Sequence, residues 1–420
     1  MSRLPMRRPH LIITSGLTLS IISSLFGGDY SYMIISLMII TLAGLTFVSK
    51  ALGFRSHLYS PFSLATYSTS WVEKISNIYL KNCWILILLT WIFGVFRGLS
   101  LDVPPDFVFR NFFGMVVYCV LPILMIFSIS VKMIIEIISY ASIFVMAFML
   151  YTLTIFVLNS PSLEQISSLS ELRSFYSAAA MVLFPLFAIS AASVFYKDWQ
   201  KNTSTGNWIT ILLSNRWGFF VILILIVLPS MSKGMMLSCF LLFFFAYLFG
   251  LTSHMRHGFI PRYFIASVIL IPVGLYFIPQ FIFDILFFTF SSEEVSNSIR
   301  SDQASYLIDD FSTLGRGLGS SLASGYVRDD SGYGFELNYL NLIHKFGIFS
   351  LTIFMSYFFT VGFALYRIWR RKFLFESYIS LGLMGFLVVG VGNPILLSSI
   401  SVILHTFAIY ILLTTRSTVR

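Results

Sequence analysis

The sequence predicts an all-α polytopic membrane protein with about twelve membrane-spanning helices. Two features of the composition lead to this prediction: 57% of the 420 residues are hydrophobic, and only 11% are charged. Soluble domains carry about 25% charged residues, and a soluble fold of this length has no interior large enough for so much apolar surface. The third observation is that the apolar residues fall into separate runs, most of them long enough to cross a bilayer.

These runs set the positions of the expected helices, since a membrane helix needs about 20 mostly apolar residues. We expect spans at residues 11–26, 31–49, 83–98, 111–131, 134–158, 176–195, 217–232, 235–251, 263–283, 338–366, 374–392 and 395–413. The first run follows Arg3, Arg7 and Arg8, as in a signal peptide. A second apolar run comes soon after it, so we interpret the pair as a retained hairpin.

The basic residues indicate the orientation of the spans. If the N-terminus is cytoplasmic and the spans alternate, most of the 27 Lys and Arg residues fall on the cytoplasmic side, as the positive-inside rule requires. Both termini are then cytoplasmic, and residues 50–82 form a long cytoplasmic segment. The net charge of +9 is distributed between the apolar runs and not gathered in a stripe, so we expect no nucleic-acid partner.

One external segment is much longer than a connector needs to be, and such loops commonly carry function. It lies between spans nine and ten, which divides the chain into helices one to nine at residues 1–283, a large loop at 284–337 and helices ten to twelve at 338–420.

The first half of this loop carries helix signals. Ser291 and Glu294 form a possible capping box, and an apolar row through Leu307 and Phe311 predicts an amphipathic helix on the outer membrane surface. Gly315 would end this helix. The glycine-rich stretch that follows should be irregular and allow tight turns.

A smaller group of basic residues lies on the external side, against the positive-inside rule. The most suggestive are Arg97, Arg110, Lys233, Arg300 and Arg316. Charged groups near membrane depth cost about 2.5–3.5 kcal/mol, so they commonly face a protein interior and mark function. One interpretation is a basic cleft that holds a pyrophosphate. The alternative is that these residues pair with lipid phosphates or with loop carboxylates such as Asp310.

A second polar group lies at the mouth of span ten. Glu336 is a candidate general base that takes a proton from a sugar hydroxyl, or else it caps the helix N-terminus. Four polar residues after it could support the site: Asn338, Asn341, His344 and Lys345. A packing role is the alternative to a proton relay for His344, and also for His405 in span twelve. No metal-ligand cluster is present in the sequence, so we expect no metal site.

Short motifs between Arg97 and Ser399 resemble the O-antigen polymerase and ligase superfamily of bacterial envelopes. PSMSKGMML is similar to the family's run of serine, basic residue and glycine, with Lys233 where arginine is usual. Arg300 with Gln303, followed by GRGLG, resembles the family's large outer loop, and VGNPILLSS resembles its Asn-Pro turn. FELNYLNLIHKFGIF is similar to the segment that opens the next helix, with glutamate, as polymerases often have, where ligases have histidine.

The resemblance implies a membrane glycosyltransferase with a GT-C-like fold in the bacterial inner membrane, with its active site facing the periplasm. It would polymerise oligosaccharide repeat units carried on undecaprenyl pyrophosphate, without a cofactor. Its partners would be this substrate, membrane lipids, and a chain-length regulator and a flippase of the same pathway. Arg300 and Glu336 would be catalytic, the other external cations would contact the pyrophosphate, and Gln303 would support them. O-antigen ligase and a flippase for lipid-linked oligosaccharides remain alternatives.

Overall fold

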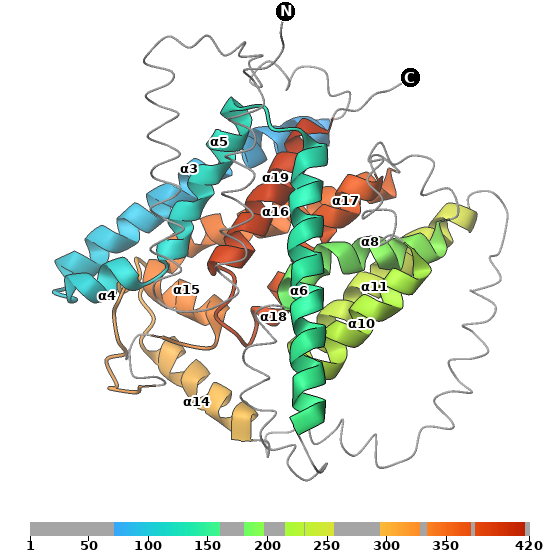
Figure 1. The fold of residues 1–420 in the computed structure, drawn as a ribbon. Helices are drawn as coiled ribbons and strands as arrows, with labels where there is room; N and C mark the ends of the chain where they lie inside the picture. The colour runs from blue at the N-terminus through green and yellow to red at the C-terminus, as the bar shows by residue number, and fades with distance from the viewer. Residues whose placement is uncertain are drawn as a thin grey trace, which may run out of the picture.

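The computed structural model describes residues 71–159, 180–196, 215–230, 232–255, 295–327, 334–370 and 374–415. These residues form helices joined by turns, with no strand among them (Figure 1). The helices are α3 (Trp71–Ser100), α4 (Pro105–Arg110), η2 (Phe113–Cys119), α5 (Val120–Ile126), α6 (Val131–Asn159), η4 (Met181–Leu183), α8 (Phe184–Phe195), α10 (Arg216–Ser230), α11 (Lys233–Met255), α14 (Val295–Asp309), α15 (Asn338–Phe346), η6 (Gly347–Phe349), α16 (Ser350–Trp369), α17 (Leu374–Leu381), α18 (Leu383–Val389) and α19 (Ser399–Thr414).

The apolar character of these helices agrees with the predicted class of membrane protein. In the described part of the chain, four helical segments are long and apolar enough to cross a membrane: Trp71–Ser100, Val131–Ile155, Lys233–Thr252 and Asn338–Trp369. Large apolar side chains also point outward from them, as on a surface that lipid covers; Phe96 is 68% exposed and Phe240 is 61% exposed. The expected spans at 11–26, 31–49 and 263–283 lie outside the described residues.

Helix α19 lies in the middle of the bundle, between α16, α17 and the η2–α5 segment (Figure 1). It is buried without interruption from Ser399 to Leu412. His405 sits on this helix with both ring nitrogens occupied: Nδ1 lies 2.7 Å from the Tyr118 hydroxyl and Nε2 lies 3.1 Å from the Thr360 hydroxyl. The imidazole also stacks on Tyr357. These contacts favour the packing interpretation of His405.

The third expected span begins earlier than the sequence indicated. Helix α3 starts at Trp71 and runs for 30 residues, so the last part of the segment 50–82, expected as a cytoplasmic connector, is helical. At 1.5 Å per residue the helix is about 45 Å long, more than the thickness of the hydrocarbon core. The prediction counted only apolar residues, whereas a helix continues through polar residues where its backbone hydrogen bonds remain favourable.

Three other expected spans are interrupted. The span at 111–131 consists of η2 and α5 between two residues with positive φ, Phe112 and Ser128. The span at 338–366 bends at Gly347, where φ is +55°, into α15 and α16. The span at 374–392 divides into α17 and α18. Hydropathy alone did not reveal these breaks, because the interrupting residues lie inside apolar runs.

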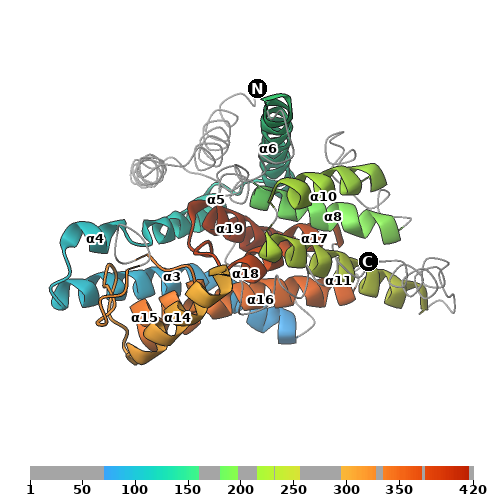
Figure 2. The same ribbon diagram turned by 90° about the horizontal axis from the view of Figure 1, so that it is seen from below.

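The helix expected in the external loop is present as α14, but it ends at Asp309 and not at Gly315. The possible capping residues Ser291 and Glu294 lie outside the described residues. The apolar row is not uniformly buried, since Leu307 is 3% exposed and Phe311 is 55% exposed. Helix α14 packs instead on α15, beside which it lies in both views (Figure 1 and Figure 2). Its buried face is therefore partly polar and is directed at protein.

Candidate functional site

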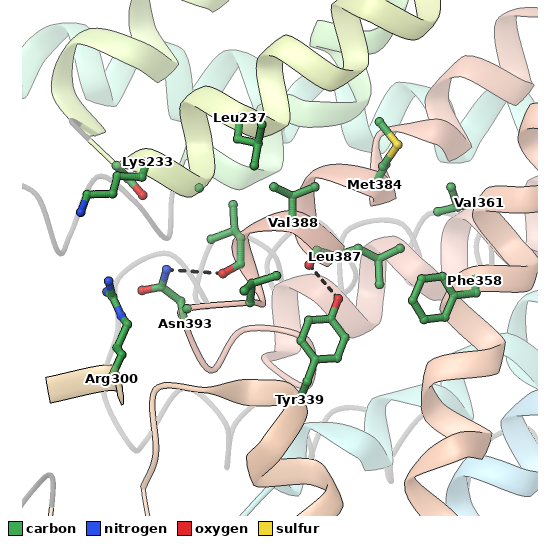
Figure 3. Close-up of a pocket in the computed structure, with 15 residues that line it drawn as sticks. Lys233, Leu237, Arg300, Tyr339, Phe358, Val361, Met384, Leu387, Val388 and Asn393 are labelled. Atoms are coloured by element: carbon green, nitrogen blue, oxygen red, sulfur yellow. Dashed lines mark hydrogen bonds between the residues drawn. The ribbon is translucent and has the colours of Figure 1, made fainter. Parts of the chain in front are cut away.

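A cavity of about 620 Å³ opens where the start of α11, the middle of α16 and the end of α18 meet α14 and α15 (Figure 3). Its lining combines one charged end with an apolar wall. The lining residues are Ser232, Lys233, Gly234, Leu237, Arg300, Tyr339, Phe358, Val361, Met384, Leu387, Val388, Val389, Val391, Gly392 and Asn393.

Two cations reach the charged end from different helices. Lys233 is the first residue of α11, and its Nζ donates to Oδ1 of Asn297 on α14 at 3.3 Å. Arg300 projects from α14 toward Lys233 and Asn393 (Figure 3). Arg300 also lies close to Gly392: a Cβ added to Gly392 would be 3.5 Å from the Nε of Arg300. Both side chains therefore converge on one end of the cavity.

The position of Lys233 is unfavourable for helix stability alone. A helix N-terminus carries partial positive charge, so a lysine there opposes the helix dipole. Ser232, Lys233 and Gly234 all line the cavity, so the first turn of α11 faces into it. A helix N-terminus with an added cation is an arrangement that binds anions. The charged end of the cavity is therefore suited to phosphate.

Glu336 lies beside Arg300, with its Oε2 3.3 Å from the Nε of Arg300. The side chain of Arg300 is 26% exposed and that of Glu336 is 28% exposed, so the pair is accessible from the surface of the protein. Helix α15 begins at Asn338 with Leu337 in the N-cap position and no side-chain cap. Glu336 is therefore next to the N-cap residue, and the contact recorded for its carboxylate is the one to Arg300.

The apolar wall is formed by Leu237, Phe358, Val361, Met384 and Leu387. Tyr339 joins α15 to α18 beside this wall, because its hydroxyl donates to the carbonyl oxygen of Leu387 at 2.7 Å (Figure 3). A ligand that fills both parts of the cavity would be amphipathic, with an anionic head and an apolar tail.

The other three cations expected on the external side do not line this cavity. The Nε of Arg97 donates to the Gly315 carbonyl at 3.3 Å, and Arg316 forms an ion pair with Asp310 at 2.6 Å. Arg110 is exposed at the end of α4. The expected gathering of all five cations is thus wrong for these three, because Arg97 and Arg316 serve contacts of the loop itself. For Arg316, the pairing with a loop carboxylate is the alternative that the structure favours.

The expected supporting residues are buried, one on α14 and four on α15. Gln303 accepts the Leu337 N–H at 3.1 Å through Oε1, and the Nε2 of His344 lies 3.0 Å from Oδ2 of Asp310. Lys345 donates to the Ser320 carbonyl and lies over the Phe335 ring at 5.1 Å. Gln303, His344 and Lys345 are all buried, as are Asn338 and Asn341. None of these five lines the cavity, so any support they give is indirect.

The glycine-rich loop, residues 312–327, is held in place by backbone contacts. Gly315, Gly317 and Gly319 have φ values of +76°, +83° and +74°, as expected for tight turns. The N–H of Arg316 donates to the His344 carbonyl at 2.7 Å, and that of Gly317 to the Lys345 carbonyl at 2.9 Å. The N–H of Leu318 donates to the Gly94 carbonyl at 2.9 Å. The loop therefore joins α15 to α3.

Asp310 anchors this loop from the end of α14. Its carboxylate contacts Arg316, His344 and, at 3.2 Å, the N–H of Ala323. Burial raises the pKa of Asp310, but the bond from His344, the Ala323 N–H and the charge of Arg316 outweigh it, so the net pKa is lowered. The ionised carboxylate is thus favoured in the folded protein.

Asp310→Asn is expected to destabilise the purified protein by about 2 kcal/mol at neutral pH, because a charged acceptor of several hydrogen bonds is lost. A lowered folded-state pKa gives stability that is present above the unfolded value of about 3.9 and is lost as pH falls through the folded value. The difference in Tm between the native protein and the variant should therefore shrink below about pH 4. Thermal unfolding in detergent measures it. Asp309→Asn, at an exposed neighbour, is the control, and a difference in Tm independent of pH would contradict the assignment.

Several cavity residues were not expected as site residues from the sequence. Asn393 was expected only as part of a turn, and Ser232 and Tyr339 were not singled out individually. The apolar wall could not be found from hydropathy, because its residues resemble any others in a membrane helix. Among the described residues, no group of three or more His, Cys, Asp and Glu side chains is placed to hold a metal ion.

Comparison of the chain with protein-family models, with curated proteins and with solved structures gives no match.

Proposed function

We propose that this protein is a membrane glycosyltransferase that polymerises oligosaccharide repeat units carried on undecaprenyl pyrophosphate into an O-antigen-type polysaccharide. The observation that carries the proposal is the cavity in which Lys233 and Arg300 face one end, beside Glu336, and apolar side chains line the rest. The motifs around these residues are those that resemble the O-antigen polymerase superfamily.

The chemistry of the cavity suits the two parts of such a donor. A pyrophosphate carries several negative oxygens, and arginine and lysine together with a helix N-terminus are the groups that bind it without a metal. A polyprenyl chain is apolar and would lie along Phe358, Met384 and Leu387. The proposed ligand therefore enters with its head at Arg300 and its tail along α16.

The pair of Arg300 and Glu336 suggests how the reaction would begin. An incoming pyrophosphate competes with the carboxylate for the guanidinium, which releases Glu336 to accept a proton from the acceptor hydroxyl. The hydroxyl oxygen then bonds to the anomeric carbon, while the bond from that carbon to the pyrophosphate oxygen breaks. The electron pair stays on the pyrophosphate, where Arg300 and Lys233 stabilise the developing charge.

The first test is the glycan profile of a strain from which the gene is deleted. Loss of a polymerase leaves a single repeat unit on the finished lipid, which is the expected result. Loss of a ligase would leave polymer on its carrier, and loss of a flippase would leave neither outside the cell. Either of these outcomes would overturn the proposal.

The second test is Glu336→Gln in the complemented strain, with protein amounts measured. The amide has nearly the same shape but cannot accept the proton, so polymer formation should fall by at least about a hundredfold. Glu136→Gln on α6, outside the cavity lining, is the matched control and should give the native ladder. A native ladder from Glu336→Gln would remove the assigned role.

A further inference from the structure

Three large apolar side chains point outward where α14 passes into the glycine-rich loop. They are Ile308, Phe311 and Leu314, each at least 48% exposed and spaced three residues apart. We name these three residues the loop edge. A group of exposed apolar side chains commonly marks contact with another protein or with a membrane. The position of the loop edge in the bundle indicates which of the two covers it.

The loop edge adjoins the bend between α15 and α16. The N–H of Ile348 donates to the carbonyl of Thr313 at 2.9 Å, which places Ile348 beside the residue that precedes Leu314. Ile348 is exposed, and Leu351 and Met355 expose apolar side chains farther along α16. The loop edge therefore continues the outward apolar face of α16, which belongs to a segment long and apolar enough to cross a membrane.

Helix α3 shows that the loop edge lies within the apolar part of the bundle. It runs antiparallel to α16, as the ring contacts between them show, and Phe93 packs on Phe349 with ring centroids 4.4 Å apart. The N–H of Leu318 donates to the Gly94 carbonyl at 2.9 Å, so the loop meets α3 at this level. One turn farther along α3, Phe96 still points a large apolar side chain outward. Since lipid surrounds a membrane protein at every level of its apolar surface, lipid is the covering that fits the loop edge.

The backbone of the loop is also suited to membrane depth. Irregular backbone is tolerated there only where protein satisfies its polar groups. The N–H groups of residues 316–318 donate to carbonyls of α15 and α3. The Lys345 side chain donates to the Ser320 carbonyl, and the carboxylate of Asp310 accepts the N–H of Ala323 at 3.2 Å. The loop therefore turns these polar groups toward protein and only its apolar edge outward.

We propose that the glycine-rich loop is a re-entrant membrane segment whose loop edge contacts the acyl chains of the leaflet on that side of the bilayer. This contact does not require the proposed glycosyl transfer. The sequence predicted that the helix itself would lie on the membrane surface, whereas α14 packs on α15 and leaves the contact with lipid to the loop edge. Lipid at the end of α14 holds the helix that carries Arg300 at a fixed depth.

The contact is tested with spin labels in the full-length protein, reconstituted in vesicles of phosphatidylethanolamine and phosphatidylglycerol. The labels are attached at Phe311→Cys and Leu314→Cys after the three native cysteines are replaced by alanine. Oxygen concentrates in lipid and a nickel chelate stays in water, so the collision rates of the label with each report its surroundings. We expect collisions with oxygen to exceed those with nickel several-fold at both positions.

Two further positions calibrate this measurement. Leu351→Cys lies on the outward face of α16 and should give the same preference for oxygen. Ser324→Cys lies on an exposed polar turn of the same loop and should give a preference for nickel. A preference for nickel at Phe311 and Leu314 would place the loop edge in water, and low collision rates with both reagents would show that protein covers it. Either result would overturn the proposal.

A charged side chain provides a second and independent test. Leu314→Asp puts a carboxylate against acyl chains, which is costly at membrane depth, so Tm in the vesicles should fall by several degrees. Leu314→Met keeps the apolar contact and should retain the native Tm. Ser324→Asp adds the same charge at the polar turn and should also retain it. Equal Tm values for Leu314→Asp and Ser324→Asp would mean that the loop edge does not touch lipid.

Discussion

Replacing Arg300 with alanine is expected to reduce polymer formation by about a hundredfold to a thousandfold, because one fixed donor to a developing oxyanion contributes about that much. Arg300 is the residue that touches both Glu336 and the turn at Gly392. Its removal would take away the proposed contact with pyrophosphate and would also remove the contact between Arg300 and Glu336. The measurement is the length distribution of the glycan ladder in cells that contain normal amounts of the variant.

Arg300→Lys and Arg110→Ala complete this experiment. Lysine keeps the charge but lacks the planar fork that binds two phosphate oxygens, so we expect an intermediate ladder. Arg110 is exposed and does not line the cavity, so its alanine variant should give the native ladder. A short ladder from Arg110→Ala with a native ladder from Arg300→Ala would contradict the role proposed for Arg300.

The class of fold could be predicted from the sequence because it depends on the total apolar content and on the lengths of the apolar runs, which do not depend on how the helices pack. Apolar content and run length require many helices, and they located most of the described ones. They could not predict the breaks at Phe112, Ser128 and Gly347, since a positive φ inside an apolar run depends on the neighbouring helix. They also could not predict that α14 would turn a polar face toward α15.

Some residues of the candidate site were identified from charge in the sequence. Lys233 and Arg300 were identified because a charge near membrane depth needs a partner, and both line the cavity. Glu336 was identified as a carboxylate at the mouth of a helix, and it lies beside Arg300. Arg97 and Arg316 met the same criterion, yet their purpose is to hold the glycine-rich loop. Charge in a sequence shows that a partner is needed, whereas only the fold shows whether that partner is a ligand or another part of the chain.

The second large effect is expected from Gly317→Ala, which should prevent the glycine-rich loop from packing on α3. The φ of Gly317 is +83°, and an added Cβ would overlap the backbone of Gly98. An L-residue in this conformation costs about 1–2 kcal/mol, and the overlap adds more because backbone cannot move aside as a side chain can. We expect a markedly lower Tm and little folded protein in the membrane.

Gly325 provides the control that separates backbone conformation from contact. Its φ is +73°, close to that of Gly317, but a Cβ there would meet nothing within 4 Å. Gly325→Ala should therefore cost about 1 kcal/mol, from conformation alone. Gly98→Ala should reproduce the larger loss from the other side, because its Cβ would overlap the Leu318 carbonyl. Equal losses at Gly317 and Gly325 would mean that the loop does not rest on α3. In that case the loop would not connect α3 with α15, the helix that begins two residues after Glu336. The proposed explanation of how Glu336 is held in position would then be wrong.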